Sequence, residues 1–265
     1  DFSWRYGRAI HGNVVILSTH HTGYDPTGEN PARFLYISQD YGETFREAEL
    51  PSIMVKDPTQ FHIHDVEYDP YTKRMWLSVG DQSNSGLYYS DDFANSWELV
   101  EGAPIRPTNI TALPNVVLFG TDDRPSAIYG YKKNDNGEKK DVKWDDIEML
   151  ITPLTSSSDV LLTANLNHMD IDANLGKQSG FVMPFERDQS GQYSATILCS
   201  PDGLHWTELF RLDELDPTFK TAALGRVIGY ATNDPKRACY IFFYHSSIGN
   251  KMVRIEVPEW VEMPL

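Results

Sequence analysis

The stretch that decides the fold is Ser38-Gln39-Asp40-Tyr41-Gly42-Glu43-Thr44-Phe45, which recurs twice in altered form. The other two copies are Ser90-Asp91-Asp92-Phe93-Ala94-Asn95-Ser96-Trp97 and Ser200-Pro201-Asp202-Gly203-Leu204-His205-Trp206. Each copy follows a short apolar run and carries Ser, then Asp two residues later, then a turn and an aromatic residue. Because Asp accepts hydrogen bonds from the amides of its own turn and Gly tolerates positive φ, each copy predicts a tight turn between strands. We therefore expect Asp40, Asp92 and Asp202 to be structural.

The spacing of these copies indicates an internal repeat. Their Ser residues lie 52 and 110 residues apart, and 110 is twice 55. A degenerate copy is therefore expected between the second and third, at the stretch that ends in Val142-Lys143-Trp144-Asp145-Asp146. A unit of about 53 residues fits five times into the 265-residue chain.

The second unit shows most clearly what one repeat contains. Four runs in it are typical of short strands bounded by turns: residues 61–68, 74–79, 87–90 and 97–100. Four such strands make one antiparallel blade, so the sequence predicts an all-β fold, a β-propeller of four-stranded antiparallel blades forming a single domain over residues 1–265. Five blades are counted, or six if one lies upstream. Their approximate bounds are 1–50, 59–101, 105–150, 158–212 and 222–260.

Composition limits the classes of function. The net charge is −15 and the pI about 4.8, which argues against nucleic acid as a partner because its phosphates need a basic face. No apolar run reaches 18 residues, so the protein is not expected to be transmembrane. Cys199 and Cys239 match no metal spacing and are interpreted as buried free thiols. Because the first residue is Asp1 and not Met, we expect a processed or excised piece.

The three turns resemble the Asp-box, or BNR, repeats of sialidase-like β-propellers. A second stretch, His62-Ile63-His64-Asp65-Val66-Glu67-Tyr68-Asp69-Pro70-Tyr71, followed by Trp76 and Val79-Gly80-Asp81, resembles uncharacterised BNR-repeat proteins. The resemblance implies a propeller that acts on or binds carbohydrate. Two features depart from the sialidase pattern. The Arg-Ile-Pro element before the first Asp-box is absent, although Arg8 is a stand-in for its arginine, and sialidases usually have six blades.

A propeller places the candidate site by strand order. The starts of first strands, the ends of second strands and the incoming loops share one face near the axis, opposite the Asp turns. We call the end of each sheet that lies on this face the rim. The catalytic candidates there are Glu186, with Asp81 and Asp122 as partner carboxylates of a glycosidase pair. The candidates for substrate binding are Arg8, His20, His21, Tyr24, His62, His64, Arg106, Asn109, Arg124, Arg187 and His245.

The histidines of this face raise the question of a metal. His62 and His64 lie two residues apart on a strand, so they are expected to point the same way and to be able to share a divalent ion. The alternative is a polar lining without metal, and no HExxH or CxxC spacing favours a cofactor.

Three functions remain open. The first is a carbohydrate-recognising, sialidase-like propeller that binds, and as a glycoside hydrolase cleaves, a glycan in the axial pocket. The second is a non-catalytic receptor-binding or adhesin propeller, for example of a viral tail fibre, and the third is a protein-interaction platform. The first two predict a glycan or glycoconjugate as partner, and a location outside the cell or on a virion or cell surface.

Overall fold

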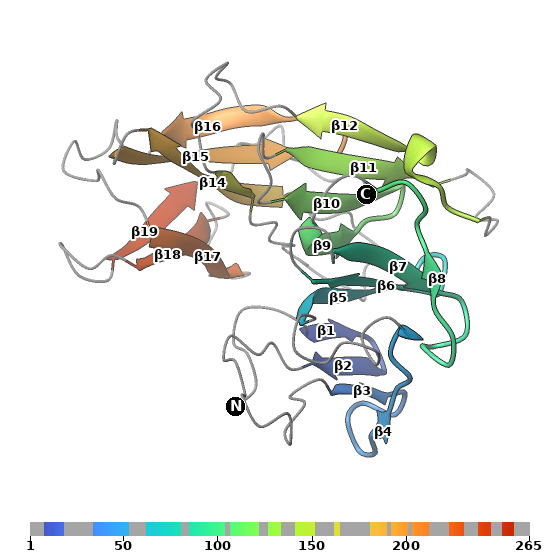
Figure 1. Ribbon diagram of the computed structural model, residues 1–265. Coiled ribbons are helices and arrows are strands. Elements are labelled where there is room, and N and C mark those ends of the chain that lie inside the picture. The colour runs from blue at the N-terminus through green and yellow to red at the C-terminus, as the bar shows by residue number, and fades with distance from the viewer. Residues whose placement is uncertain are drawn as a thin grey trace, which may run out of the picture. The chain divides into compact units, whose positions relative to one another are not determined.

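The computed structural model describes the chain as short strands joined by turns (Figure 1). Within the described ranges, no helix is long and apolar enough to cross a membrane. The described residues are 8–18, 34–52, 62–80, 85–103, 107–121, 127–133, 141–151, 162–164, 181–189, 192–200, 203–211, 223–230, 238–244 and 251–256.

The strands form antiparallel sheets, each of which takes up consecutive strands in chain order. The first sheet contains β1 (Arg8–His11), β2 (Val14–Ser18), β3 (Leu35–Ser38) and β4 (Arg46–Glu47). The second contains β5 (Ile63–Asp69), β6 (Arg74–Val79), β7 (Gly86–Ser90) and β8 (Glu98–Leu99). The third contains β9 (Pro107–Ala112), β10 (Val116–Thr121), β11 (Ile128–Lys132) and β12 (Ile147–Ile151).

Two more sheets complete the described part of the chain. The fourth contains β13 (Leu162–Ala164), β14 (Phe181–Gln189), β15 (Gln192–Ser200) and β16 (Thr207–Arg211). The fifth has three described strands, β17 (Ala223–Tyr230), β18 (Ala238–Tyr244) and β19 (Lys251–Glu256). This construction confirms the predicted fold class, an all-β propeller built from four-stranded antiparallel blades.

The chain divides into two compact units, residues 1–119 with 131–148 and residues 120–130 with 149–265. Within the first unit, β1 and β2 pack against β5, while β5 and β6 pack against β9. The first strands of three successive sheets therefore lie next to one another, as the strands around a propeller axis do (Figure 1). The expectation of one domain over residues 1–265 stays a prediction.

Trp76 is the largest fully buried side chain among the residues whose burial is described. It lies on β6, a central strand whose six residues are all buried. Its ring centroid is 5.9 Å from that of Tyr89, 5.4 Å from Phe119 and 5.6 Å from Tyr131. Aromatic side chains from the second and third sheets thus share one apolar cluster, and this packing joins the two sheets.

The first Ser-x-Asp turn connects β3 to β4 by side-chain hydrogen bonds. The Ser38 hydroxyl donates to Asp40 Oδ1 at 2.6 Å and accepts from the Gly42 amide at 2.8 Å. Asp40 Oδ1 also accepts from the Thr44 amide at 2.9 Å. These two side chains thus satisfy amides that the turn itself leaves without partners, as the sequence predicts.

The second turn, between β7 and β8, repeats this pattern. The Ser90 hydroxyl donates to Asp92 at 2.8 Å and accepts from the Ala94 amide at 2.8 Å, and Asp92 Oδ1 accepts from the Ser96 amide at 3.0 Å. Here Ala94 stands where the first turn has glycine, and it adopts φ +59°. A residue with a Cβ pays a steric cost in this left-handed region, so the hydrogen bonds of Ser90 hold a strained turn in place.

The third turn is one residue shorter than the other two. The Gly203 amide donates to Ser200 Oγ at 2.7 Å, and the Trp206 indole donates to the Gly203 carbonyl at 3.1 Å. At the place of the predicted degenerate copy, Trp144–Asp146 form a short 3-10 helix, η2, that leads directly into β12. In the described part of this connection, residues 141–146, the Lys143 amide donates to Asp146 Oδ2 at 3.1 Å, and no Ser-x-Asp pair takes part.

Replacement of Ser90 by alanine should destabilise the protein. Ser90→Ala leaves the amide of the fully buried Ala94 without an acceptor, so the free energy of unfolding should fall by about 1–3 kcal/mol. Urea unfolding of this variant and of Gln39→Ala, an exposed position in the first turn, measures the difference. A loss no larger than that of the control would contradict this role of the hydroxyl.

The turn carboxylates should titrate in strong acid. Hydrogen bonds from Ser38 and Thr44 lower the pKa of Asp40 to about 2. Slight burial opposes the shift at Asp92, but hydrogen bonds from Ser96 and Ser90 outweigh it and lower its pKa to about 2. Both groups therefore contribute stability that is present above their unfolded pKa of about 3.9 and is lost as the pH falls toward 2. NMR of the carboxyl carbons should show both midpoints near 2, and Ser38→Ala should raise that of Asp40.

Candidate functional site

The predicted site face corresponds, in the second sheet, to the end where β5 begins and β6 ends. Ile63 pairs with Val79, and the Gly80 amide donates to the His62 carbonyl at 2.9 Å. The Ser-x-Asp turn of this sheet lies at the other end, since Ser90 pairs with Met75 near the start of β6. Strand order thus separates the rim of this sheet from its turn.

His62 and His64 meet at this rim. Their ring centroids are 4.4 Å apart with the rings at 70°, an edge-to-face arrangement. A β-bulge between Ile63 and Asp65 places His64 outside the regular pairing, so the two histidines are not related by simple alternation. His64 Nε2 lies 2.8 Å from the Gly80 carbonyl and must donate to it, while the side chain is almost fully buried.

No three His, Cys, Asp or Glu side chains gather to form a metal site among the residues that the structure describes. The His62–His64 pair supplies two ring systems, and one nitrogen of His64 already binds a carbonyl oxygen. Binding of a divalent ion by this pair stays a prediction.

Asn109 is on β9, beside the start of β5. The amide of the next residue, Ile110, donates to Asp65 Oδ2 at 2.7 Å, which ties this part of β9 to the residue after His64. Asn109 is 9% exposed, and its Oδ1 has no hydrogen-bond partner. Ser18, the last residue of β2, is likewise buried, and its Oγ also lacks a partner. Buried oxygens without partners are unusual, so each of them marks a place where a donor is missing.

The other predicted site residues divide into two groups. Arg8 begins β1 and pairs with Leu17, whereas Glu186 and Arg187 lie within β14; the side chains of all three are outside the described set. The sequence predicts Glu186 at the end of a second strand, but β14 continues beyond it to Gln189. Outside the described residues lie His20, His21, Tyr24, Asp81, Arg106, Asp122, Arg124 and His245.

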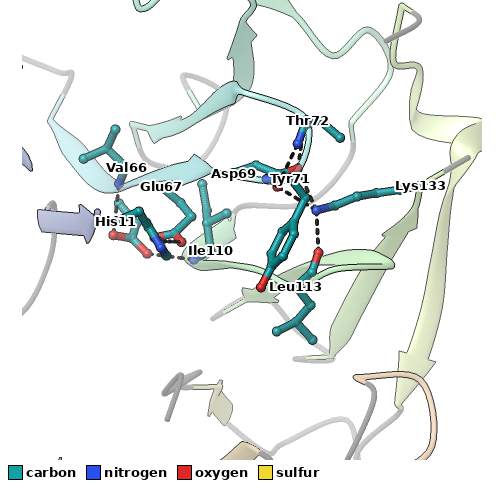
Figure 2. Close-up of polar contacts among 10 residues, drawn as sticks. His11, Val66, Glu67, Asp69, Tyr71, Thr72, Ile110, Leu113 and Lys133 are labelled. Carbon is teal, nitrogen blue, oxygen red and sulfur yellow. Dashed lines mark hydrogen bonds and ion pairs between the residues drawn. The ribbon is translucent and has the colours of Figure 1, made fainter. Parts of the chain in front are cut away.

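Sequence reasoning missed a row of three carboxylates on β5. Asp65, Glu67 and Asp69 alternate along the strand, so their side chains leave it on one side. The sequence does carry a signal for this row, because acidic residues occupy every second position from Asp65 to Asp69, in and directly after the predicted strand 61–68. The predicted site residues, however, were taken from strand ends and loops. Each of the three carboxylates binds a group from another part of the chain, and Figure 2 shows the contacts of this region.

Glu67 contacts both neighbouring sheets. Its Oε1 lies 2.8 Å from His11 Nε2 at the end of β1 (Figure 2). It also accepts from the Ala112 amide on β9. The side chains of His11 and Glu67 are 14% and 13% exposed. Burial raises the pKa of Glu67, although the hydrogen bond from His11 opposes this shift.

Asp69 and Lys133 form a buried ion pair at the far end of the row. Lys133 Nζ lies 2.7 Å from Asp69 and also donates to the Leu113 carbonyl (Figure 2). The two side chains are 4% and 1% exposed, and the Tyr71 ring lies 4.7 Å from the ammonium. Asp69 further accepts from the Thr72 hydroxyl at 2.6 Å, and burial lowers the pKa of Lys133. So many partners indicate a structural pair that joins the β5–β6 turn to the third sheet.

This pair offers a test against an adjacent one. Lys133→Met should lower the free energy of unfolding by about 3–5 kcal/mol, because Asp69 then stays buried without its counter-ion. Lys132→Met should cost less than about 1 kcal/mol, since Lys132 and Glu148 are half exposed at 51% and 58%. Adding Asp69→Asn to Lys133→Met should recover part of the loss. Equal effects of the two lysine changes in urea unfolding would contradict the role given to Lys133.

Comparison with known proteins yields neither a matching family model nor a matching curated protein. Two of the matching solved structures cover nearly the whole chain. "YCF48 bound to D1 peptide" matches 95% of this chain and 78% of its own, with 12% identity and a TM-score of 0.39. An endo-arabinase from Bacteroides thetaiotaomicron VPI-5482 matches 97% of this chain and 98% of its own, with 13% identity and a TM-score of 0.43. At these values neither likeness carries an inference about substrate or partner.

Proposed function

We propose that this propeller binds a glycan or glycoconjugate at the rim, where its first strands begin and its second strands end. The observation that carries the proposal is Asn109, a buried amide on β9 whose Oδ1 lacks a partner. The next residue, Ile110, donates to Asp65 on β5, close in sequence to His62 and His64. Sugar hydroxyls are donors as well as acceptors, so they can complete such a set of side chains. A binding pocket typically combines a few convergent polar groups with apolar surroundings, and Asn109 would supply one such group.

The three turns support the assignment to the sialidase-like group. In two of them the Ser hydroxyl binds the Asp carboxylate and the Asp accepts amides of its own turn, which is the role expected of an Asp-box. The turn and the rim lie at opposite ends of the second sheet, so the proposed site is free of the turn's structural carboxylates. A protein of this kind would act outside the cell or on a virion or cell surface.

Hydrolysis is the finer form of the proposal. Glu186 would act as the acid, with Asp81 or Asp122 as its partner carboxylate, and Arg8, Arg124 or Arg187 would hold an acidic sugar. The alternative is a receptor-binding or adhesin propeller that holds the glycan without cleaving it. The missing Arg-Ile-Pro element favours this alternative, since a sialidase uses that arginine to grip a carboxylate.

A glycan array tests binding. The wild-type chain should retain a defined set of glycans, and Asn109→Leu should weaken their binding by about tenfold or more, since one hydrogen bond to a buried group is lost. Lys132→Ala, at the exposed end of β11, should bind as the wild type does. No retained glycan, or equal binding by Asn109→Leu, would remove the rim from the proposal.

A panel of fluorogenic glycosides, run beside the array, separates the two forms. Turnover that Glu186→Gln abolishes would support hydrolysis with this acid, and turnover insensitive to that change would remove Glu186 from the mechanism. Binding on the array without turnover on any glycoside would favour the receptor-binding alternative.

A further inference from the structure

Glu67 lies at a junction of three sheets. It is on the first strand of the second sheet, and it contacts His11 on the first strand of the first sheet (Figure 2). It also contacts the Ala112 amide on the first strand of the third sheet. The three segments are far apart in sequence, so this single side chain closes two long-range contacts. Any change in its charge therefore acts on two interfaces between sheets together.

The pair of Glu67 and His11 can carry zero, one or two protons. With one proton the pair is neutral overall, whether it is written as carboxylate with imidazolium or as carboxylic acid with imidazole. With none it is a net anion, and with two a net cation. Since both side chains are mostly buried, and burial penalises net charge, the folded protein favours the one-proton state.

Several charged or titratable groups lie near the pair. Nearby, Lys133 and Asp69 carry opposite charges 2.7 Å apart and offset each other, while Asp65 is engaged with the Ile110 amide. The β9 contact of Glu67 is a backbone amide and carries no charge. The described titratable or charged groups that face Glu67 or His11 from the packed elements are Asp65, Tyr68, Asp69 and Lys133.

We propose that Glu67 and His11 form a proton-linked clasp that holds the first strands of the first three sheets together and that tightens as the pH falls from alkaline to mildly acidic values. In the unfolded chain at pH 8, glutamate is ionised and histidine is neutral, so the pair holds no proton. The folded pair keeps one proton to higher pH than the unfolded pair does. Folding then takes up a proton, and stability is present at the lower pH and lost as the pH rises through the folded titration.

The linkage can be measured on the full chain by urea unfolding between pH 6 and pH 9. The wild type should become more stable toward pH 6, and its unfolding constant should rise more steeply with increasing pH than that of Glu67→Gln. The difference in slope is at most about tenfold per pH unit, the limit for one proton. Glu67→Gln keeps the size and the acceptor oxygen of the side chain but cannot titrate in this range, and His11→Gln should show the same loss of slope.

A matched control is Asp65→Asn, which changes the neighbouring carboxylate of the same strand, one that accepts from the amides of Val66 and Ile110. Its pH slope should equal that of the wild type. If Glu67→Gln kept the wild-type slope, or if Asp65→Asn lost it as fully, the clasp would be overturned.

NMR of the His11 ring gives a second readout that a merely structural contact would not move. In the wild type the ring should titrate at a higher pH than in Glu67→Gln. If Glu67→Gln does not fold, the titration midpoint of His11 in the wild type tests the clasp by itself. A His11 midpoint above the ordinary value of about 6.5 supports the clasp, and a midpoint at or below it overturns it.

Discussion

The structure depends on hydrogen bonds between the backbone amides of one sheet's edge strand and the side chains of the neighbouring sheet. β9 is the first strand of its sheet, so alternate amides point away from β10 and must find partners elsewhere. Two of these, Ile110 and Ala112, donate to carboxylates of β5. Carboxylates at every second position of β5 thus accept hydrogen bonds from amides at every second position of β9. This match keeps the two strands in a fixed register without a continuous ladder of backbone bonds, and it leaves the edge closed to other strands.

The opposite end of the second sheet is held in a different way. There Arg74, almost fully buried, binds Asp91 through two hydrogen bonds of 2.9 and 2.7 Å, and its guanidinium lies 4.3 Å from the Tyr89 ring. Asp91 is the residue between Ser90 and Asp92 in the turn, so the same turn is fixed to β6 as well as to its own amides. The turn end is therefore crowded with structural ion pairs and hydrogen bonds. These structural contacts lie at the end of the sheet opposite the rim.

Much of the fold could be predicted because its signals are local. The Ser-x-Asp turns follow from residue type and spacing, and β6 has the bounds that were predicted for it. Contacts between sheets could not be predicted, since nothing in the sequence says that Lys133 reaches Asp69 or that His11 reaches Glu67. The bulge next to His64 was missed for a related reason. It is a response to packing, and it allows Ile63 and Val66, three residues apart, both to join the core.

That bulge also explains why a single strand serves two purposes. Beyond it, regular alternation sends Val66 and Tyr68 into the core and Glu67 and Asp69 toward the neighbouring sheets. Before it, the phase changes, so Ile63 points into the core with Val66 and His62 falls on the opposite side of the strand. The extra residue is His64, which is buried and donates to the Gly80 carbonyl. Without the bulge, His62 would fall in the same phase as Val66 and Tyr68 in place of Ile63, and burying an imidazole there would be costly.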